Sequence, residues 1–327
     1  MSSDGSSAST TSTQRRSPWA SPELVIPQRA IRAVPTASWL AVGWLVVAWL
    51  LAGWLLACEG RDGGPETASS GSEGTARAPG AAEPTDTADP FGGLSVRWIG
   101  SPEGDGPVVV LMHGYGATGD DLVPLARALA ATPSEGDRGL AAGTRFLLPA
   151  APLELGGGAR AWWPLDIDRL RRRFSKGGPD EGELDVEPDG LAQARDQVRA
   201  LLDDLRDRLG VPPSRTVVGG FSQGAMLATD AVVHGEDDLA GLVILSGGVV
   251  ARRRWAASMP ARRAVPVFLS HGRRDPLIPF ATAARLSQML HTAGYEVDEM
   301  SFDGGHEIPP DVRRRLAVFV ARTISAR

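Results

Sequence analysis

The chain has 327 residues, of which 43% are hydrophobic and 22% are charged, and its formal net charge is −5 at pH 7. This length allows one large domain with accessory segments or two small domains. Nothing in this charge balance favours nucleic-acid binding, which usually needs a basic face, and the single cysteine, Cys58, excludes an intramolecular disulfide.

The N-terminal part contains one long apolar segment. Residues 1–36 are rich in Ser, Thr, Ala and Pro and show no apolar periodicity, so we predict no fold there. Residues 39–57 then form an uncharged apolar run of about the length that crosses a bilayer core. This run is either an uncleaved transmembrane helix with its basic N-terminal side in the cytoplasm or a secretory signal.

The end of this run favours the second hypothesis. The sequence Leu55-Leu56-Ala57-Cys58 resembles a bacterial lipoprotein processing site, in which a cysteine after a small residue becomes lipidated. A cysteine placed there by coincidence is the third alternative. Both anchored hypotheses place the rest of the chain outside the cytoplasm, so we expect an extracytoplasmic, membrane-anchored protein with Cys58 as the lipidation site.

A linker follows the apolar run. Residues 59–90 consist mainly of Gly, Ala, Ser, Thr, Pro, Glu and Asp, and they cannot bury enough apolar surface to offset chain entropy. We therefore predict a signal or anchor segment over residues 1–58, a disordered linker over 59–90 and a folded domain over 91–327.

The folded domain alternates short apolar runs with amphipathic stretches. The runs predict buried strands, each followed closely by Gly, Ser or Pro: residues 108–112, 145–148, 216–218, 242–245 and 265–269. The amphipathic stretches predict helices over residues 120–131, 190–209, 281–293 and 310–324. This alternation indicates a doubly wound, mostly parallel α/β sheet with helices on both faces, in which ligands bind beyond the carboxyl ends of the strands.

A nucleophile motif follows one of these strands. Gly220-Phe221-Ser222-Gln223-Gly224 has the G-x-S-x-G pattern, with the strand 216–218 before it and a predicted helix over 225–233 after it. In this context the tight turn exposes the serine, and the small residues let strand and helix approach. The alternative is an inert serine in a turn. A serine hydroxyl needs a base to take its proton and an acid to orient that base.

The base and the acid come from the last two strand ends. His306 lies in a Gly304-Gly305-His306 loop after the strand-like stretch 296–302, and Asp275 lies just past the strand 265–269. The order Ser, Asp, His fits this fold class. Asp303 is the competing acid, and His271 is interpreted as a structural histidine.

Two backbone N–H groups are candidates for stabilising the oxyanion. One is that of Gln223, immediately after the nucleophile, and the other is that of Tyr115, in the loop after the strand 108–112. We expect His113, at the start of that loop, to brace it rather than to carry a proton.

Taken together, these motifs resemble the phospholipase/carboxylesterase family, which includes acyl-protein thioesterases. The matching segments occur in the family's order: Leu111-Met112-His113-Gly114-Tyr115-Gly116, Arg160-Ala161-Trp162-Trp163, Gly219-Gly220-Phe221-Ser222-Gln223-Gly224-Ala225, His271-Gly272-Arg273-Arg274-Asp275-Pro276-Leu277-Ile278-Pro279 and Gly304-Gly305-His306-Glu307-Ile308-Pro309. The resemblance implies an α/β-hydrolase fold, a triad of Ser222, Asp275 and His306, and neither a metal nor an organic cofactor. Trp162 and Trp163 either line the acyl pocket or pack in the core, and the charged stretch 164–190 departs from the family where it borders that pocket.

The leading hypothesis is a serine carboxylesterase that forms an acyl-enzyme on small to medium acyl esters, with thioesters as further substrates. One alternative is a secreted esterase of the feruloyl or polyester type. The other is a non-catalytic cell-surface binding protein on a hydrolase fold. The expected partners are a small ester substrate and, through the N-terminal anchor, a membrane.

Overall fold

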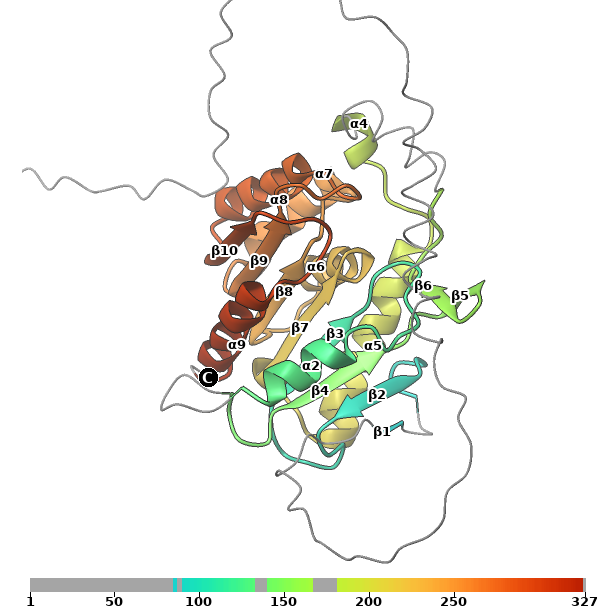
Figure 1. Cartoon of the computed structure of the whole chain (residues 1–327), viewed down its shortest axis with the longest axis vertical. Coiled ribbons are helices and arrows are strands. Elements are labelled where there is room, and N and C mark those ends of the chain that lie inside the picture. The colour runs from blue at the N-terminus through green and yellow to red at the C-terminus, as the bar shows by residue number, and fades with distance from the viewer. Residues whose placement is uncertain (1–84, 87–89, 133–139, 167–180, 326–327) are drawn as a thin grey trace, which may run out of the picture. The chain divides into compact units, whose positions relative to one another are not determined.

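The computed structural model describes residues 85–86, 90–132, 140–166 and 181–325 (Figure 1). The apolar run 39–57, Cys58 and most of the linker lie outside the described residues. No helix in the described ranges has both the length and the hydrophobicity required to cross a membrane.

Eight strands form the main sheet of the described chain, in the order β1-β2-β4-β3-β7-β8-β9-β10. Their bounds are Thr85–Asp86, Val96–Ile99, Arg145–Pro149, Val108–Met112, Thr216–Phe221, Gly241–Leu245, Val267–Gly272 and Val297–Phe302, in that order. Neighbours from β4 to β10 pair in parallel, and only the β1–β2 and β2–β4 pairs are antiparallel. The predicted doubly wound, mostly parallel sheet is therefore confirmed.

Helices cover both faces of this sheet. The longer ones are α2 (Val123–Ala130), α5 (Leu191–Leu209), α6 (Gln223–His234), α7 (Arg252–Ser258), α8 (Phe280–Ala293) and α9 (Pro310–Ser325). Alternate residues of β3 point to opposite faces: Val109 and Leu111 pack in the cluster with α2 and α9, whereas Val108 and Val110 pack in the cluster with α5, α6 and α8. Figure 1 shows α2 and α9 on the near face of the sheet.

Several short elements were not predicted. A separate antiparallel hairpin, β5 (Leu153–Gly156) and β6 (Ala159–Ala161), follows β4, and the short helix α4 (Glu181–Leu184) precedes α5. The short 3₁₀ turns η2 (Pro213–Arg215) and η3 (Met259–Arg262) come before β7 and after α7.

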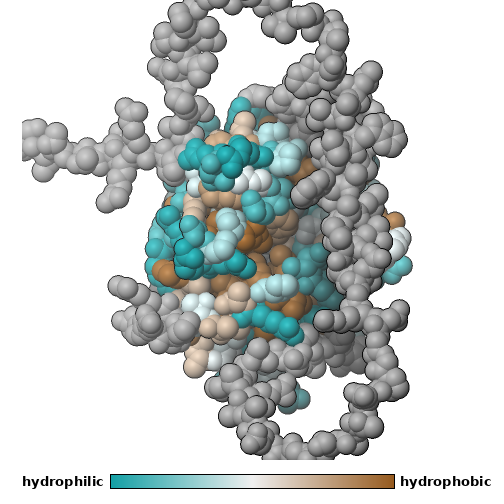
Figure 2. All heavy atoms as spheres, in the orientation of Figure 1, coloured by the Kyte–Doolittle hydropathy of each residue, from teal (hydrophilic) through white to brown (hydrophobic). Residues whose placement is uncertain are grey.

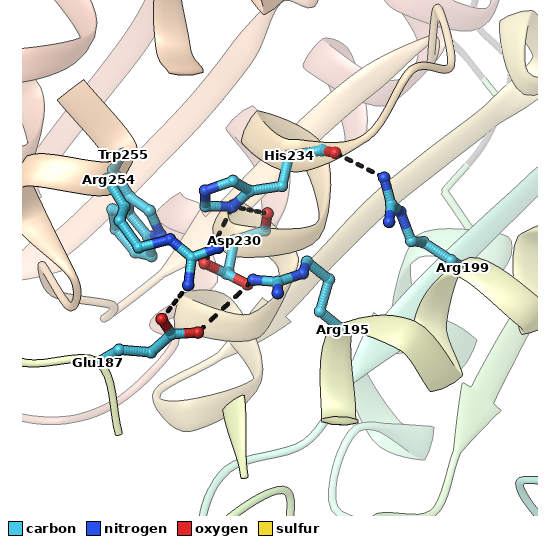
Figure 3. A network of polar contacts seen from close by, with 7 residues as sticks. All are labelled: Glu187, Arg195, Arg199, Asp230, His234, Arg254 and Trp255. Atoms are coloured by element: carbon cyan, nitrogen blue, oxygen red, sulfur yellow. Dashed lines mark hydrogen bonds and ion pairs between the residues drawn. The ribbon is translucent and has the colours of Figure 1, made fainter. Parts of the chain in front are cut away.

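A buried carboxylate fixes α6, the helix that follows Ser222. Asp230 is fully buried and forms an ion pair with Arg195 of α5 at 2.7 Å, and it accepts a hydrogen bond from Trp255 Nε1 of α7 at 2.7 Å (Figure 3). Burial, the largest influence, raises the pKa of Asp230. The hydrogen bonds from His234 and Trp255 and the charge of Arg195 outweigh it, so this pKa lies below its usual value. The ionised carboxylate thus ties three helices together.

Candidate active site

Ser222 occupies the sharp turn between β7 and α6. Its backbone has φ 56° and ψ −118°, a conformation that costs a non-glycine residue energy and is typical of functional sites. A Cβ on Gly220 would lie 2.6 Å from the Met112 carbonyl oxygen, and one on Gly224 would lie 2.1 Å from that oxygen. The two glycines of the motif are therefore needed because α6 and β3 approach each other closely here.

Asp275 and His306 come together from neighbouring strands. β9 and β10 pair in parallel, so the loops that follow them leave the same edge of the sheet. His306 Nδ1 lies 2.7 Å from Asp275 Oδ2. Asp275 Oδ1 accepts the backbone N–H groups of Leu277 and Ile278, each at 2.8 Å. The carboxylate is thus held in one orientation by three groups: two backbone N–H groups of its own loop and the imidazole of the histidine loop.

The environment of Asp275 favours its ionised form. Burial, the largest influence, raises the pKa of this carboxyl, but the hydrogen bond and charge of His306 and the two backbone donors outweigh it, so the pKa lies below its usual value. An ionised Asp275 can accept a hydrogen bond only from a protonated Nδ1, and in that neutral tautomer of His306 the lone pair is on Nε2.

Phe221 links His306 to the nucleophile turn. The ring centroids of Phe221 and His306 are 4.6 Å apart with an angle of 47° between the planes, and Phe221 directly precedes Ser222. No sequence pattern predicts this contact, because it depends on how the loop after β10 folds back over the end of β7.

The competing residues have other partners. Asp303, with 74% of its side chain exposed, pairs with Arg274. His271 is fully buried, donates from Nε2 to the Ile278 carbonyl at 2.8 Å, and lies 3.3 Å from Asp275 Oδ2. Burial lowers the pKa of His271. His291 contacts Glu299, and His234 contacts Asp230. These positions fit structural roles for His271, His291 and His234.

The loop after β3 lies against Ser222. A Cβ on Gly114 would lie 3.2 Å from the Ser222 Cβ, so the loop backbone reaches the nucleophile. Gly116 N–H donates to the Arg160 carbonyl at 2.8 Å and ties the loop to β6. Within the described chain, the N–H groups of Tyr115 and Gln223 donate to no protein acceptor. Both are thus available to a ligand.

The sequence of this domain matches a known family. A family model described as Phospholipase/Carboxylesterase matches residues 99–324, which is more than half of the chain. The chain belongs to the phospholipase/carboxylesterase family. The fold described above is accordingly the α/β-hydrolase fold, and the chain is a serine hydrolase of carboxylic ester bonds.

Individual relatives agree with this assignment. Acyl-protein thioesterase 1 of Emericella nidulans is 28% identical over 230 residues, which cover 67% of this chain and 90% of that protein. The protein of the same name from Saccharomyces cerevisiae is 27% identical over 232 residues, with 67% and 93% covered. Among solved structures, esterase PE8 is 27% identical, with a TM-score of 0.57 over 70% of this chain and 99% of its own. Membership favours an enzyme over the non-catalytic binding protein.

Two tryptophans of the family segment around β6 occupy different surroundings. Both are almost fully buried. Trp162 lines a pocket of about 260 Å³ together with Pro152, Leu153, Pro164 and the start of α5. Trp163 is not among the residues that line this pocket and packs beside Gly190, where an added Cβ would lie 3.2 Å from its own. Ser222, Asp275 and His306 are not among the residues that line this pocket, so an acyl pocket lined by the two tryptophans stays a prediction.

Metal ligands are not grouped in the described ranges: no three His, Cys, Asp or Glu side chains there lie close enough to hold an ion.

Proposed function

We propose that the chain hydrolyses small to medium carboxylic esters, and thioesters, through an acyl-enzyme on Ser222. In this mechanism His306 Nε2 takes the Ser222 hydroxyl proton while Oγ attacks the acyl carbonyl, and Asp275 orients the imidazole and stabilises its charged form. The backbone N–H groups of Tyr115 and Gln223 donate to the oxyanion of the tetrahedral intermediate.

The two halves of the cycle use the same groups. His306 passes the proton to the leaving alkoxide or thiolate, which departs as an alcohol or thiol and leaves the acyl group on Ser222. A water molecule then gives its proton to His306 and attacks the acyl-enzyme, and the carboxylic acid leaves as Ser222 recovers its proton.

The observation that carries the proposal is the 2.7 Å contact between His306 Nδ1 and Asp275, together with the strained backbone of Ser222, whose neighbour Phe221 contacts the His306 ring. Apolar surface near the site supports an acyl substrate. Phe221 and Ile308 are partly exposed and Leu277 is 41% exposed, and Figure 2 shows apolar (brown) surface between hydrophilic (teal) areas on this face of the domain.

The test uses the full-length protein in detergent, with p-nitrophenyl esters and thioesters of graded chain length and a fluorophosphonate probe. We expect ester hydrolysis, probe attachment to the peptide that contains Ser222, and loss of both in Ser222→Ala, with kcat lower by more than about a thousandfold. Hydrolysis by Ser222→Ala within tenfold of the wild type would refute the mechanism. Aryl and polymeric esters in the same panel test for the feruloyl or polyester type of esterase.

We also propose that the enzyme is an extracytoplasmic lipoprotein anchored through Cys58. Support comes from the apolar run 39–57, the Ala57-Cys58 pair and the polar linker that follows them. Such a tether lets the hydrolase domain reach substrates away from the membrane surface.

A further inference from the structure

The loop that carries the Tyr115 N–H is held by a histidine with no assigned part in the chemistry. His113, at the end of β3, is 1% exposed. Its Nε2 lies 2.9 Å from the backbone nitrogen of Ala151, and its Nδ1 lies 2.8 Å from the carbonyl oxygen of Gly114. Both ring nitrogens are therefore occupied inside the protein, and neither is free to exchange protons with a substrate.

These two contacts determine which nitrogen carries the proton. The Ala151 amide has only an N–H to offer, so Nε2 of His113 must accept with its lone pair. The Gly114 carbonyl can only accept, so Nδ1 must donate. Only the neutral imidazole with its proton on Nδ1 satisfies both contacts. Burial, the largest influence, lowers the pKa of His113 against the opposing effects of its hydrogen bond and of Asp121, which favours this neutral form.

The Nδ1 contact also sets the direction of the Tyr115 N–H. The Gly114 carbonyl and the Tyr115 N–H belong to one planar trans peptide unit, so they point in opposite directions and rotate together. The Gly114 oxygen is fixed by His113 Nδ1 and by the Ala117 N–H, which donates to it at 3.3 Å. The Tyr115 N–H is therefore held in a single orientation.

Hydrogen bonds also connect His113 to Gln223, the residue that supplies the other oxyanion donor. Trp162 Nε1 donates to the His113 carbonyl at 2.9 Å. The buried side chain of Gln223 accepts the Trp162 N–H at 3.0 Å and donates to the Trp163 carbonyl at 2.9 Å. The segment around Trp162 thus connects the loop of Tyr115 to the residue that supplies the second N–H.

We propose that His113 is a positioning residue for ester hydrolysis: as a neutral imidazole protonated on Nδ1, it holds the Gly114–Tyr115 peptide so that the Tyr115 N–H points at the oxyanion. The proposal rests on the proposed function, because it requires the oxyanion to form at Ser222. Aspartates 120 and 121 and Arg160 are the charged groups that influence the ring.

The kinetic test separates the two ring nitrogens. His113→Leu removes both contacts, whereas His113→Asn keeps a side-chain N–H where Nδ1 was. An oxyanion donor acts in the transition state, so its misplacement lowers kcat and leaves KM almost unchanged. We expect His113→Leu to lose about 10- to 100-fold in kcat with KM within about threefold, and His113→Asn to recover most of that loss. His291→Leu, outside the site, is the matched control and should retain the wild-type kcat.

A second measurement uses the wild-type protein and does not depend on a variant folding. In long-range ¹H–¹⁵N correlation spectra of the full-length protein labelled in histidine, the His113 ring should carry its proton on Nδ1, with the signal assigned by its loss in His113→Asn. A proton on Nε2, a wild-type kcat in His113→Leu, or equal losses in the Leu and Asn variants would overturn the proposal. Activity retained by Ser222→Ala would instead refute the proposed function.

Discussion

Asp275 and His306 lie 31 positions apart in the sequence, yet their side chains meet at 2.7 Å because β9 and β10 are parallel neighbours. The carboxylate is 0% exposed and the imidazole 11%. This shielding from water strengthens their interaction, and the backbone N–H groups of Leu277 and Ile278 keep the Asp275 carboxylate from turning away.

Replacing Asp275 should separate orientation from charge. Asp275→Asn keeps the shape of the side chain but can present an N–H to His306 Nδ1, which would turn the proton of the imidazole onto Nε2 and block its role as a base. We expect kcat to fall by about 10⁴-fold while the protein stays folded. The measurement is steady-state ester hydrolysis, with near-ultraviolet circular dichroism to check the fold.

Asp303→Asn is the matched control for that variant. Asp303 pairs with Arg274 at the surface, so its substitution should leave kcat unchanged. If kcat fell as far in Asp303→Asn as in Asp275→Asn, the assignment of Asp275 as the acid of the triad would be wrong.

Sequence patterns predicted the strands that are continuously apolar. The central strands are continuously apolar because both faces are covered, so β3, β7 and β8 were recognisable. Strand β2, which lies between β1 and β4, contains Arg97, and β5 is exposed along its whole length, so neither shows a continuous apolar run.

The sequence likewise predicted some features of the site and not others. Ser222, Asp275 and His306 were candidates because each follows a predicted strand, they occur in the order Ser, Asp, His, and the carboxyl ends of parallel strands meet at one edge of a sheet. The Phe221–His306 contact and the proton position on His113 depend on loop conformation, and no spacing in the sequence encodes them.

The Arg195–Asp230 pair should dominate the stability of the helices around the nucleophile. Asp230→Asn would leave Arg195, with only 10% of its side chain exposed, with the more distant Glu187 carboxylate, at 3.9 Å, as its remaining acidic partner. We expect the free energy of unfolding to fall by about 3 to 5 kcal/mol. Urea unfolding followed by tryptophan fluorescence measures this change.

Two further variants define the origin of that loss. Substituting Arg195→Met together with Asp230→Leu removes both charges, so it should recover part of the stability, with the Trp255 N–H left unpaired. Breaking the exposed Arg206–Asp203 pair with Asp203→Asn should leave the urea midpoint unchanged. A smaller loss in Asp230→Asn than in Asp203→Asn would contradict the interpretation.

Cys58→Ser tests the proposed anchor. If Cys58 is the lipidated residue, the variant should lose the lipid mass from its mature N-terminus in mass spectrometry, and uncleaved precursor should accumulate. An unchanged molecular mass with continued membrane retention would favour the uncleaved transmembrane helix.

The two buried histidines predict how stability depends on pH. Burial lowers the pKa of both His113 and His271 below 6.5 in the folded protein. Below about pH 6.5 the unfolded chain binds protons at these rings that the folded chain does not, so the free energy of unfolding decreases as the pH falls. Each ring should contribute a slope that approaches about 1.4 kcal/mol per pH unit.

The carboxylates act at lower pH, which lets the histidine contribution be isolated. Asp230 and Asp275 have lowered pKa values, so the stability that they provide is present above about pH 4 and is lost only as the pH falls through their folded values. Urea unfolding between about pH 6.5 and 5 therefore reports mainly on the two rings. His113→Asn and His271→Asn should each remove about half of the slope in this window, because each replaces one titrating ring by a group that does not titrate. Equal slopes in the wild type and in both variants would show that these rings do not exclude protons in the folded state.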